Sequence, residues 1–295
     1  MSREVVLNRL VVCLLSVFSH LIADDIRPFC ILTDREGAGM FSMFSDVLAL
    51  VDCYDRGIFQ GVEIDFGEKG LYWVKNYGPN WWNYYSEPIS LGEKNNVFKG
   101  EYSELPNMAR RYDYKDRKEA YNLIEKYIHF RPYLLKEVEN FVHAHFDGCY
   151  VIGIHYRGTD AGGLSYDLYF NKIRQITQLL KKNDYKIFVA TDDQSFIDDI
   201  IEKFPNRVCF QQQILRSSDQ RPLHFNAEYN LCLQGKEALI DCLLLSKSSC
   251  LILSFSNLSL WAALLNPYIP ALDVSKSLPI VNLKGNFNEE NFILP

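Results

Sequence analysis

The sequence predicts an α/β fold whose second half forms a parallel sheet. Short apolar runs of strand length alternate with amphipathic stretches of helix length between residues 149 and 265. Such alternation is typical of parallel sheets, because parallel strands need long crossover connections. In addition, three polar clusters each directly follow a predicted strand. Open parallel sheets bind ligands beyond the carboxyl ends of their strands, so this pattern indicates a binding site.

The individual elements follow from apolar spacing along the chain. In the first half we expect strands at 29–32 and 61–66 and helices at 40–54, 113–127 and 132–145. In the second half we expect strands at 149–154, 186–190, 208–210 and 250–253, and helices at 166–182, 195–203, 235–245 and from Leu258 onward. The aromatic-rich segment 71–85 is interpreted mainly as core, with sugar stacking as the alternative.

We expect three regions along the chain. Residues 1–23 resemble a signal peptide that is cleaved after Ala23, and the alternative is a first helix or strand of the fold. A boundary near residue 146 separates region 24–146 from region 147–295. The leader would direct the protein to export or to the lumen of the secretory pathway, and without it the protein would be cytoplasmic. Its apolar run is too short to predict an integral membrane span.

Composition excludes several classes of function. The net charge is −6 and there is no basic block, which argues against nucleic acid as a partner. The eight cysteines form no CxxC pair and no Cys/His spacing of a metal site, so we expect no bound metal. No phosphate-binding P-loop, complete GxGxxG, GxSxG or HExxH motif is present.

Three polar clusters lie at the expected carboxyl edge of the second sheet. They are His155, Arg157 and Asp160; Thr191, Asp192 and Asp193; and Ser254, Ser256 and Asn257. Taken singly, the second and third clusters fit helix caps, and Arg157 fits an ion pair with Asp160. Their shared edge favours one ligand site instead. An Arg and a helix start both suit phosphate, so we expect a phosphorylated ligand.

Asp241 lies within the apolar helix predicted at 235–245. A buried carboxylate is costly unless it is paired or accepts hydrogen bonds. It could therefore accept hydrogen bonds from the edge of a nucleotide base. The alternative is that this face of the helix is partly exposed.

Together these motifs resemble those of the α1,6-fucosyltransferases, which include the core and nodulation enzymes. Residues 152–160 resemble the first motif of that family, and residues 188–193 followed by Phe204-Pro205 resemble the second. Asp241, Leu245-Ser246 and 254–257 resemble the third, with the same internal spacing. The resemblance covers about residues 149–265, in order.

The resemblance implies a GT-B-like pair of Rossmann-like α/β domains. Region 24–146 would lie on the acceptor side, and region 147–295 would bind the nucleotide sugar. The implied reaction is an inverting, metal-independent transfer of fucose from GDP-fucose to a hydroxyl of an oligosaccharide or glycoconjugate. No cofactor is implied.

The resemblance also implies roles for individual residues. His155 and Asp241 would meet guanine and Arg157 the diphosphate. The third cluster, with the backbone of Leu258, would hold phosphates; its members are Ser254, Ser256 and Asn257. Asp192 and Asp193 match acidic residues needed for activity in that family, and Asp160 is a further candidate catalytic residue.

The sequence departs from the family pattern at three positions. Gly158 and Ala161 stand where family members often carry Arg and Lys, and Ser165 stands where a Glu is the proposed base. Asp167 lies two residues further on and is the substitute base that we consider. Two alternatives therefore stay open: a catalytically inactive protein of the same fold that binds glycan or nucleotide, and a transferase for another GDP-sugar. The acceptor also stays open.

Overall fold

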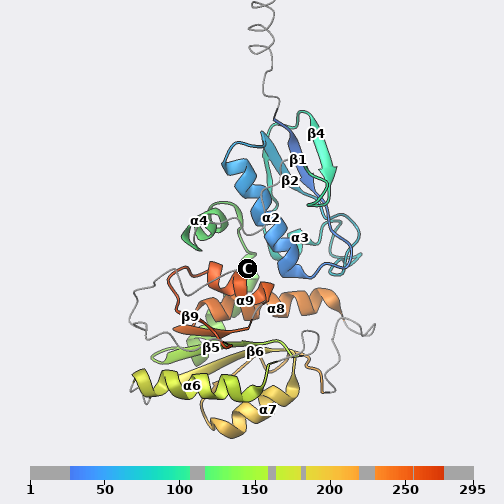
Figure 1. Cartoon of the computed structure of the whole chain (residues 1–295). Helices are drawn as coiled ribbons and strands as arrows, with labels where there is room; N and C mark the ends of the chain where they lie inside the picture. Colours follow the sequence, from blue (N-terminus) through green and yellow to red (C-terminus); the bar gives the residue numbers. More distant parts are fainter. Residues whose placement is uncertain are drawn as a thin grey trace, which may run out of the picture.

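Two β-sheets organise the chain, one from each half of the sequence (Figure 1). The computed structural model describes residues 27–106, 117–158, 164–180, 184–218, 230–254 and 256–275. The first sheet has the order β3-β2-β1-β4, with β1 (Phe29–Leu32), β2 (Gly61–Ile64), β3 (Ser90–Gly92) and β4 (Val97–Gly100). The second has the order β7-β6-β5-β8-β9, with β5 (Tyr150–Tyr156), β6 (Tyr185–Thr191), β7 (Val208–Cys209), β8 (Cys250–Leu253) and β9 (Ala271–Asp273).

Eight helices connect and cover these strands within the described residues. They are α2 (Met40–Asp55), α3 (Trp82–Tyr85), α4 (Arg117–Tyr127), α5 (Pro132–His145), α6 (Tyr166–Leu180), α7 (Gln194–Lys203), α8 (Leu231–Ser246) and α9 (Asn257–Leu264). Figure 1 shows α6 and α7 on one face of the second sheet and α8 and α9 on the other. Because both faces are covered, β5 and β8 are almost wholly buried, which explains their continuous apolar sequences.

All neighbouring strands of the second sheet are parallel. In their register, His155 of β5 lies opposite Ala190 of β6 and Leu253 of β8. The three strands therefore end at one edge, as the sequence predicts for a shared site. In the first sheet, β1 pairs in parallel with β2 and β4, whereas β3 is antiparallel to β2.

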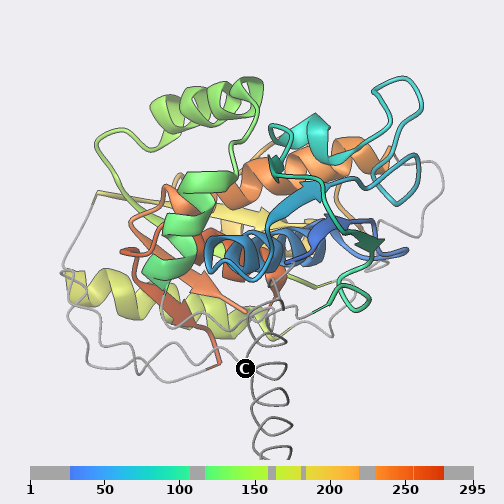
Figure 2. The ribbon, with the colours of Figure 1, turned by 90° about the horizontal axis from the view of Figure 1, so that it is seen from above.

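Helix α2 joins the two halves of the molecule. It packs on β2, α4 and α9, and most of its side chains are buried. Seen from above, α2 lies over α9 of the second half (Figure 2). A hydrogen bond of 3.0 Å from Trp261 Nε1 to Ser45 Oγ fixes this contact. The core is consequently continuous from the first sheet to α8 and α9.

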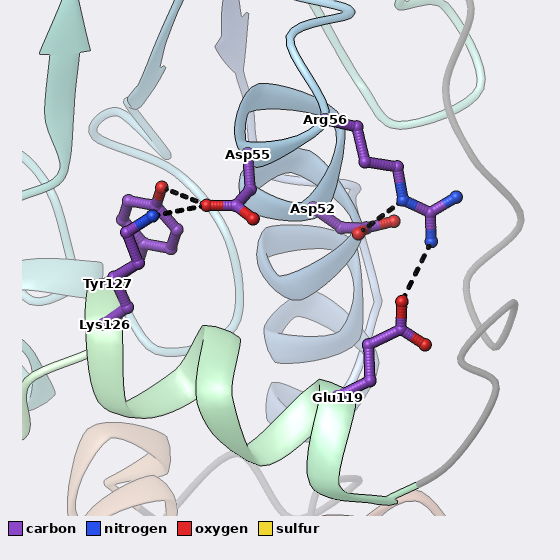
Figure 3. A network of polar contacts seen from close by, with 6 residues as sticks. All are labelled: Asp52, Asp55, Arg56, Glu119, Lys126 and Tyr127. Carbon is purple, nitrogen blue, oxygen red and sulfur yellow. Dashed lines mark hydrogen bonds and ion pairs between the residues drawn. The ribbon is translucent and has the colours of Figure 1, made fainter.

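A polar network holds α4 against the carboxyl-terminal end of α2 (Figure 3). Asp55 accepts hydrogen bonds from Lys126 Nζ at 2.6 Å and from the Tyr127 hydroxyl at 2.7 Å. A second contact joins the same two helices, where Arg56 Nη2 lies 3.8 Å from Glu119 Oε1. Most of these groups are partly exposed, so each contact contributes modestly and the network mainly sets the position of α4.

The predicted α/β class and the parallel second sheet are confirmed. The predicted helix at 235–245 is longer than expected, because Asn230 caps a helix that begins at Leu231. Apolar spacing did not predict β3, β4, α3 and β9, which are all short. In the aromatic segment the core interpretation is correct for Trp81, Trp82 and Tyr85, whose side chains are fully buried.

Several expectations fall on other parts of the chain. The predicted leader 1–23 and the start of the predicted helix 113–127 lie outside the described residues. The domain boundary near residue 146 stays a prediction. Within the described ranges, the helices are too short or too polar to cross a bilayer.

Candidate functional site

A cavity of about 550 Å³ lies where the two halves meet. The second half supplies the carboxyl ends of β5 and β6 and the amino-terminal ends of α8 and α9. The first half supplies the amino-terminal end of α2 and the loop residues Leu71 and Tyr72. The cavity therefore occupies the strand edge at which ligands are expected in α/β proteins.

Two of the three predicted polar clusters contribute side chains from the strand ends. His155 and Arg157 at the end of β5 line the cavity together with Thr191 and Asp192 at the end of β6. Strands β5 and β6 are hydrogen-bonded neighbours, so a cation and a carboxylate face the same space. Arg157 is partly exposed there, so an anion from solution can reach its guanidinium.

The start of α9 forms another wall of the cavity. Ser256 caps this helix, because its hydroxyl accepts a hydrogen bond of 3.0 Å from the Ser259 N–H. His155 Nδ1 lies 2.7 Å from Ser259 Oγ and 3.2 Å from Ser256 Oγ, so the imidazole is fixed to the helix start. Asn257 and Leu258 begin the helix and line the cavity. The first N–H groups of a helix have no partner within it, and they favour an anion.

Asp241 is buried on α8 and also lines the cavity, with 6% of its surface exposed. Burial raises the pKa of its carboxyl group from 3.8 to about 7. Gln211 Nε2 donates a hydrogen bond of 2.6 Å to Asp241 Oδ1, and the charge of Arg216 also favours the carboxylate. The helix face at this position is therefore internal, and the alternative of a partly exposed face is wrong.

Other predicted site residues do not line the cavity. Asp193 caps α7 instead: its carboxylate accepts from the Ser195 N–H at 2.8 Å and from the Tyr166 hydroxyl at 2.7 Å. Only 1% of Asp193 is exposed, so the capping alternative describes this residue. Asp167 is exposed in the first turn of α6.

Ser254 and Asp160 are the remaining predicted site residues. Ser254 lies beside the Tyr169 hydroxyl and is not part of the cavity wall. Asp160 lies outside the described residues, as does Ala161. Of the third cluster, Ser256 and Asn257 at the start of α9 thus line the cavity, whereas Ser254 after β8 does not.

The first half contributes a wall that the sequence analysis did not predict. Gly37 and Gly39 precede α2 and line the cavity with Met40. Gly37 has φ +76°, a conformation that other residues rarely adopt. The Tyr72 hydroxyl accepts a hydrogen bond of 2.9 Å from the Met40 N–H. The glycines between a predicted strand and a predicted helix were the available signal, because such loops bring backbone N–H groups to ligands.

Helix α8 presents a cavity-facing stripe that was also missed. Besides Asp241, the stripe includes Leu231, Gln234, Gly235, Glu237 and Ala238. Their spacing of three and four residues is that of one helix face. The prediction began this helix at residue 235, so Gln234 fell in a loop. The asparagine cap at Asn230 was the signal for the earlier start.

Comparisons with known proteins identify the fold. No protein-family model matches the chain, and no curated protein matches it. A solved structure of the NodZ alpha-1,6-fucosyltransferase superposes with a TM-score of 0.52 at 19% identity, over 84% of this chain and 95% of NodZ. The chain has the NodZ fucosyltransferase fold. A NodZ structure from Bradyrhizobium gives a TM-score of 0.53 at 18% identity, over 81% of this chain and 93% of NodZ.

This likeness confirms the predicted fucosyltransferase-like architecture. The NodZ match extends across both halves of the chain, whereas the motif resemblance covered only about residues 149–265. The first half thus carries the fold of the same enzymes without a recognisable sequence motif. The GT-B-like arrangement, with a cavity between two α/β sheets, is the one that the resemblance implies.

Proposed function

We propose that the chain is a glycosyltransferase that transfers fucose from GDP-fucose to a hydroxyl group of a glycan. The observation that supports this most strongly is the composition of the cavity wall. One cavity gathers a guanidinium, a helix start and a buried carboxylate in the NodZ fold. One of the NodZ structures was obtained from crystals soaked with GDP-fucose.

In this proposal the donor lies along the strand ends. Asp241 accepts hydrogen bonds from the ring N–H and the amino group of guanine, and His155 lies beside the base. Arg157 and the N–H groups at the start of α9 bind the diphosphate. These groups match the charge of a nucleoside diphosphate, which is anionic at one end and rich in donors at the other.

The chemistry is a single displacement at the anomeric carbon of fucose. The bond from this carbon to the β-phosphate oxygen breaks, and the electron pair leaves with GDP. Arg157 and the start of α9 stabilise the negative charge that develops on the phosphate, and loss of one such group costs about 3 kcal/mol. The acceptor oxygen forms the new bond from the opposite face, which inverts the configuration.

A carboxylate must take the proton of the acceptor hydroxyl. Asp192 is the side chain that we assign to this role, because it lines the cavity on the strand next to Arg157. Asp167 is exposed outside the cavity wall, and Asp193 is engaged in capping α7. General-base catalysis of this kind contributes roughly a hundredfold to ten-thousandfold in rate.

The test combines binding with turnover. Calorimetry should show that GDP binds and that ADP and UDP do not. Adenine and uracil lack the adjacent ring N–H and amino group from which Asp241 would accept hydrogen bonds. Labelled GDP-fucose should then be transferred to a panel of glycan acceptors, with the same rate in EDTA. Strict dependence on added manganese or magnesium would contradict the metal-independent reaction. Equal binding of UDP and GDP would contradict the proposal as a whole.

The same experiment separates the two alternatives. A protein that binds GDP but neither hydrolyses nor transfers GDP-fucose is a nucleotide-binding relative without catalysis. Faster transfer from another GDP-sugar than from GDP-fucose identifies a different donor.

A further inference from the structure

Glu237 is a cavity carboxylate to which the proposed function gives no role. It lines the cavity on α8, one helical turn before Asp241, and is half-buried. Within the described part of the chain, its carboxylate has no hydrogen bond or ion pair. The neighbouring Lys236 is engaged elsewhere, since its Nζ lies 2.6 Å from Glu137 Oε1. A half-buried carboxylate without hydrogen bonds is a candidate to receive them from a ligand.

The order of groups along α8 can be compared with the parts of the donor. Gly235 packs against Tyr72, because a Cβ atom at Gly235 would lie 2.8 Å from the Tyr72 ring. Tyr72 and Arg157 line the same cavity. The amino-terminal part of the stripe therefore faces the part of the cavity that Tyr72 lines. Asp241, at the opposite end, is six residues or about 9 Å further along the helix axis.

The polar groups of the stripe also follow the chemistry of a nucleoside diphosphate. Gln234, next to Gly235, has a buried Nε2 without a hydrogen-bond partner among the described residues. This donor suits phosphate oxygens, which only accept. Glu237 and Asp241 follow as acceptors, toward the ribose and the base, which both donate.

The surroundings of Glu237 lower the cost of its charge. Burial raises its pKa, and the positive charge of Arg216 opposes that effect. Arg216 is held in place by hydrogen bonds from its guanidinium to the carbonyls of Gln211 at 2.8 Å and Ile214 at 3.3 Å. Gln211 Nε2 also lies 3.3 Å from the Glu237 carbonyl while it bonds Asp241. One loop thus contacts α8 at both Glu237 and Asp241.

We propose that Glu237 binds the ribose of the donor, with its carboxylate accepting hydrogen bonds from the 2′- and 3′-hydroxyl groups. This inference rests on the proposed function, and it adds a residue that makes the site selective for ribonucleotides. Glu237 lies one helical turn from Asp241 on the same face of α8, and the ribose of a bound GDP is bonded directly to the base that Asp241 would meet.

The experiment compares the affinities of GDP, 2′-deoxy-GDP and 2′,3′-dideoxy-GDP by calorimetry. Wild-type protein should bind GDP roughly tenfold to a hundredfold more tightly than the deoxy forms, because each lost hydrogen bond involves a charged acceptor. Glu237→Ala should bind all three with similar, weak affinity. Glu237→Gln, which keeps one acceptor oxygen and the shape, should show an intermediate ratio.

Two controls separate this inference from the proposed function. Glu202→Ala removes an exposed carboxylate from α7 and should leave the ratios unchanged. Asp241→Asn should lower the affinities for GDP and for 2′-deoxy-GDP by the same factor. No binding of GDP to the wild type would refute the proposed function. Two results would refute the role of Glu237 alone. One is that GDP binds and the ratio of GDP affinity to deoxy-GDP affinity is the same in wild type and Glu237→Ala. The other is that Glu237→Ala lowers kcat while its GDP affinity is unchanged.

Discussion

The two halves of the molecule contribute different chemistry to one cavity. The second half contributes charged side chains at strand ends and on α8, such as Arg157, Asp192 and Asp241. The first half contributes mainly backbone and apolar surface, from Gly37 and Gly39 to the start of α2. We infer that the second half binds the donor by charge and hydrogen bonds, while the first half gives the cavity its shape. Substitutions in the two halves should then differ in kind.

The largest effect is expected at Arg157, in the charged half. Arg157→Ala should lower kcat/KM by about a thousandfold and abolish measurable GDP binding, since in the proposed mechanism this guanidinium serves both binding and the transition state. Arg157→Lys should rescue poorly, because an ammonium group cannot form the planar pair of hydrogen bonds. The exposed Arg174, changed to Ala, is the matched control and should have no effect. GDP affinity that is unchanged in Arg157→Ala would contradict the proposed site.

The next effect distinguishes two adjacent carboxylates. Asp192→Asn should lower kcat by about a hundredfold while GDP affinity stays within a few-fold, because a general base is needed only for turnover. Asp193→Ala should instead lower the free energy of unfolding by about 1 kcal/mol, because it removes the acceptor that caps α7. Steady-state kinetics and thermal unfolding of both variants measure the difference. The assignment fails if the two variants lose kcat equally and neither is destabilised.

Asp241 should show a smaller effect on binding, together with a pH dependence. Asp241→Asn should weaken GDP roughly tenfold, because one acceptor oxygen becomes a donor. In the wild type, GDP affinity should fall as the pH drops below about 7, where this carboxyl gains a proton. Titrations by calorimetry at pH 6, 7 and 8 test both statements. If GDP affinity falls equally in wild type and variant as the pH is lowered, the titrating group is not Asp241.

The same raised pKa has a consequence for stability. The folded state holds a proton that the unfolded state releases between pH 3.8 and about 7. Stability of the wild type should therefore decrease as the pH rises through this window, by at most about 1.4 kcal/mol per pH unit. Asp241→Asn should lack this contribution, which denaturant unfolding across the window can measure.

The contrast between the halves also explains what the sequence could predict. Strands β5, β6 and β8 are buried on both faces, so their continuous apolar runs were recognised. Strands β3 and β4 expose most of their side chains and carry no such pattern. Arg157 and Asp192 could be predicted because each directly follows a recognised strand.

Other site residues depend on contacts that are distant in sequence. Tyr72 reaches the cavity through a loop, and its hydrogen bond to Met40 spans 32 residues. No local periodicity encodes such a contact. Asp192 and Asp193 are adjacent and chemically identical, and only the position of α7 shows which one caps the helix. Sequence patterns thus identified the edge of the sheet, while the packing of the two halves decides which side chains face the cavity.

The smallest effect is expected at Gly235, where the two halves touch. A Cβ atom there would lie 2.5 Å from Met40 Cε and 2.8 Å from both the Tyr72 ring and the Tyr85 hydroxyl. Tyr85 has little freedom to move, because its hydroxyl donates a hydrogen bond of 2.7 Å to the Cys232 carbonyl. The close approach therefore requires a residue without a side chain at this position of α8.

Gly235→Ala tests this packing through the sign of its effect. In an ordinary helix interior the change stabilises by about 1 kcal/mol, because alanine loses less backbone entropy. Here overpacking costs roughly 1–3 kcal/mol and should outweigh that gain. We expect a net loss of about 1 kcal/mol and a Tm lower by about 2–4 °C. The exposed Leu233, changed to Ala, is the control on the same helix. A higher Tm in Gly235→Ala would mean that the halves pack less closely, so that the first half does not set the shape of the cavity.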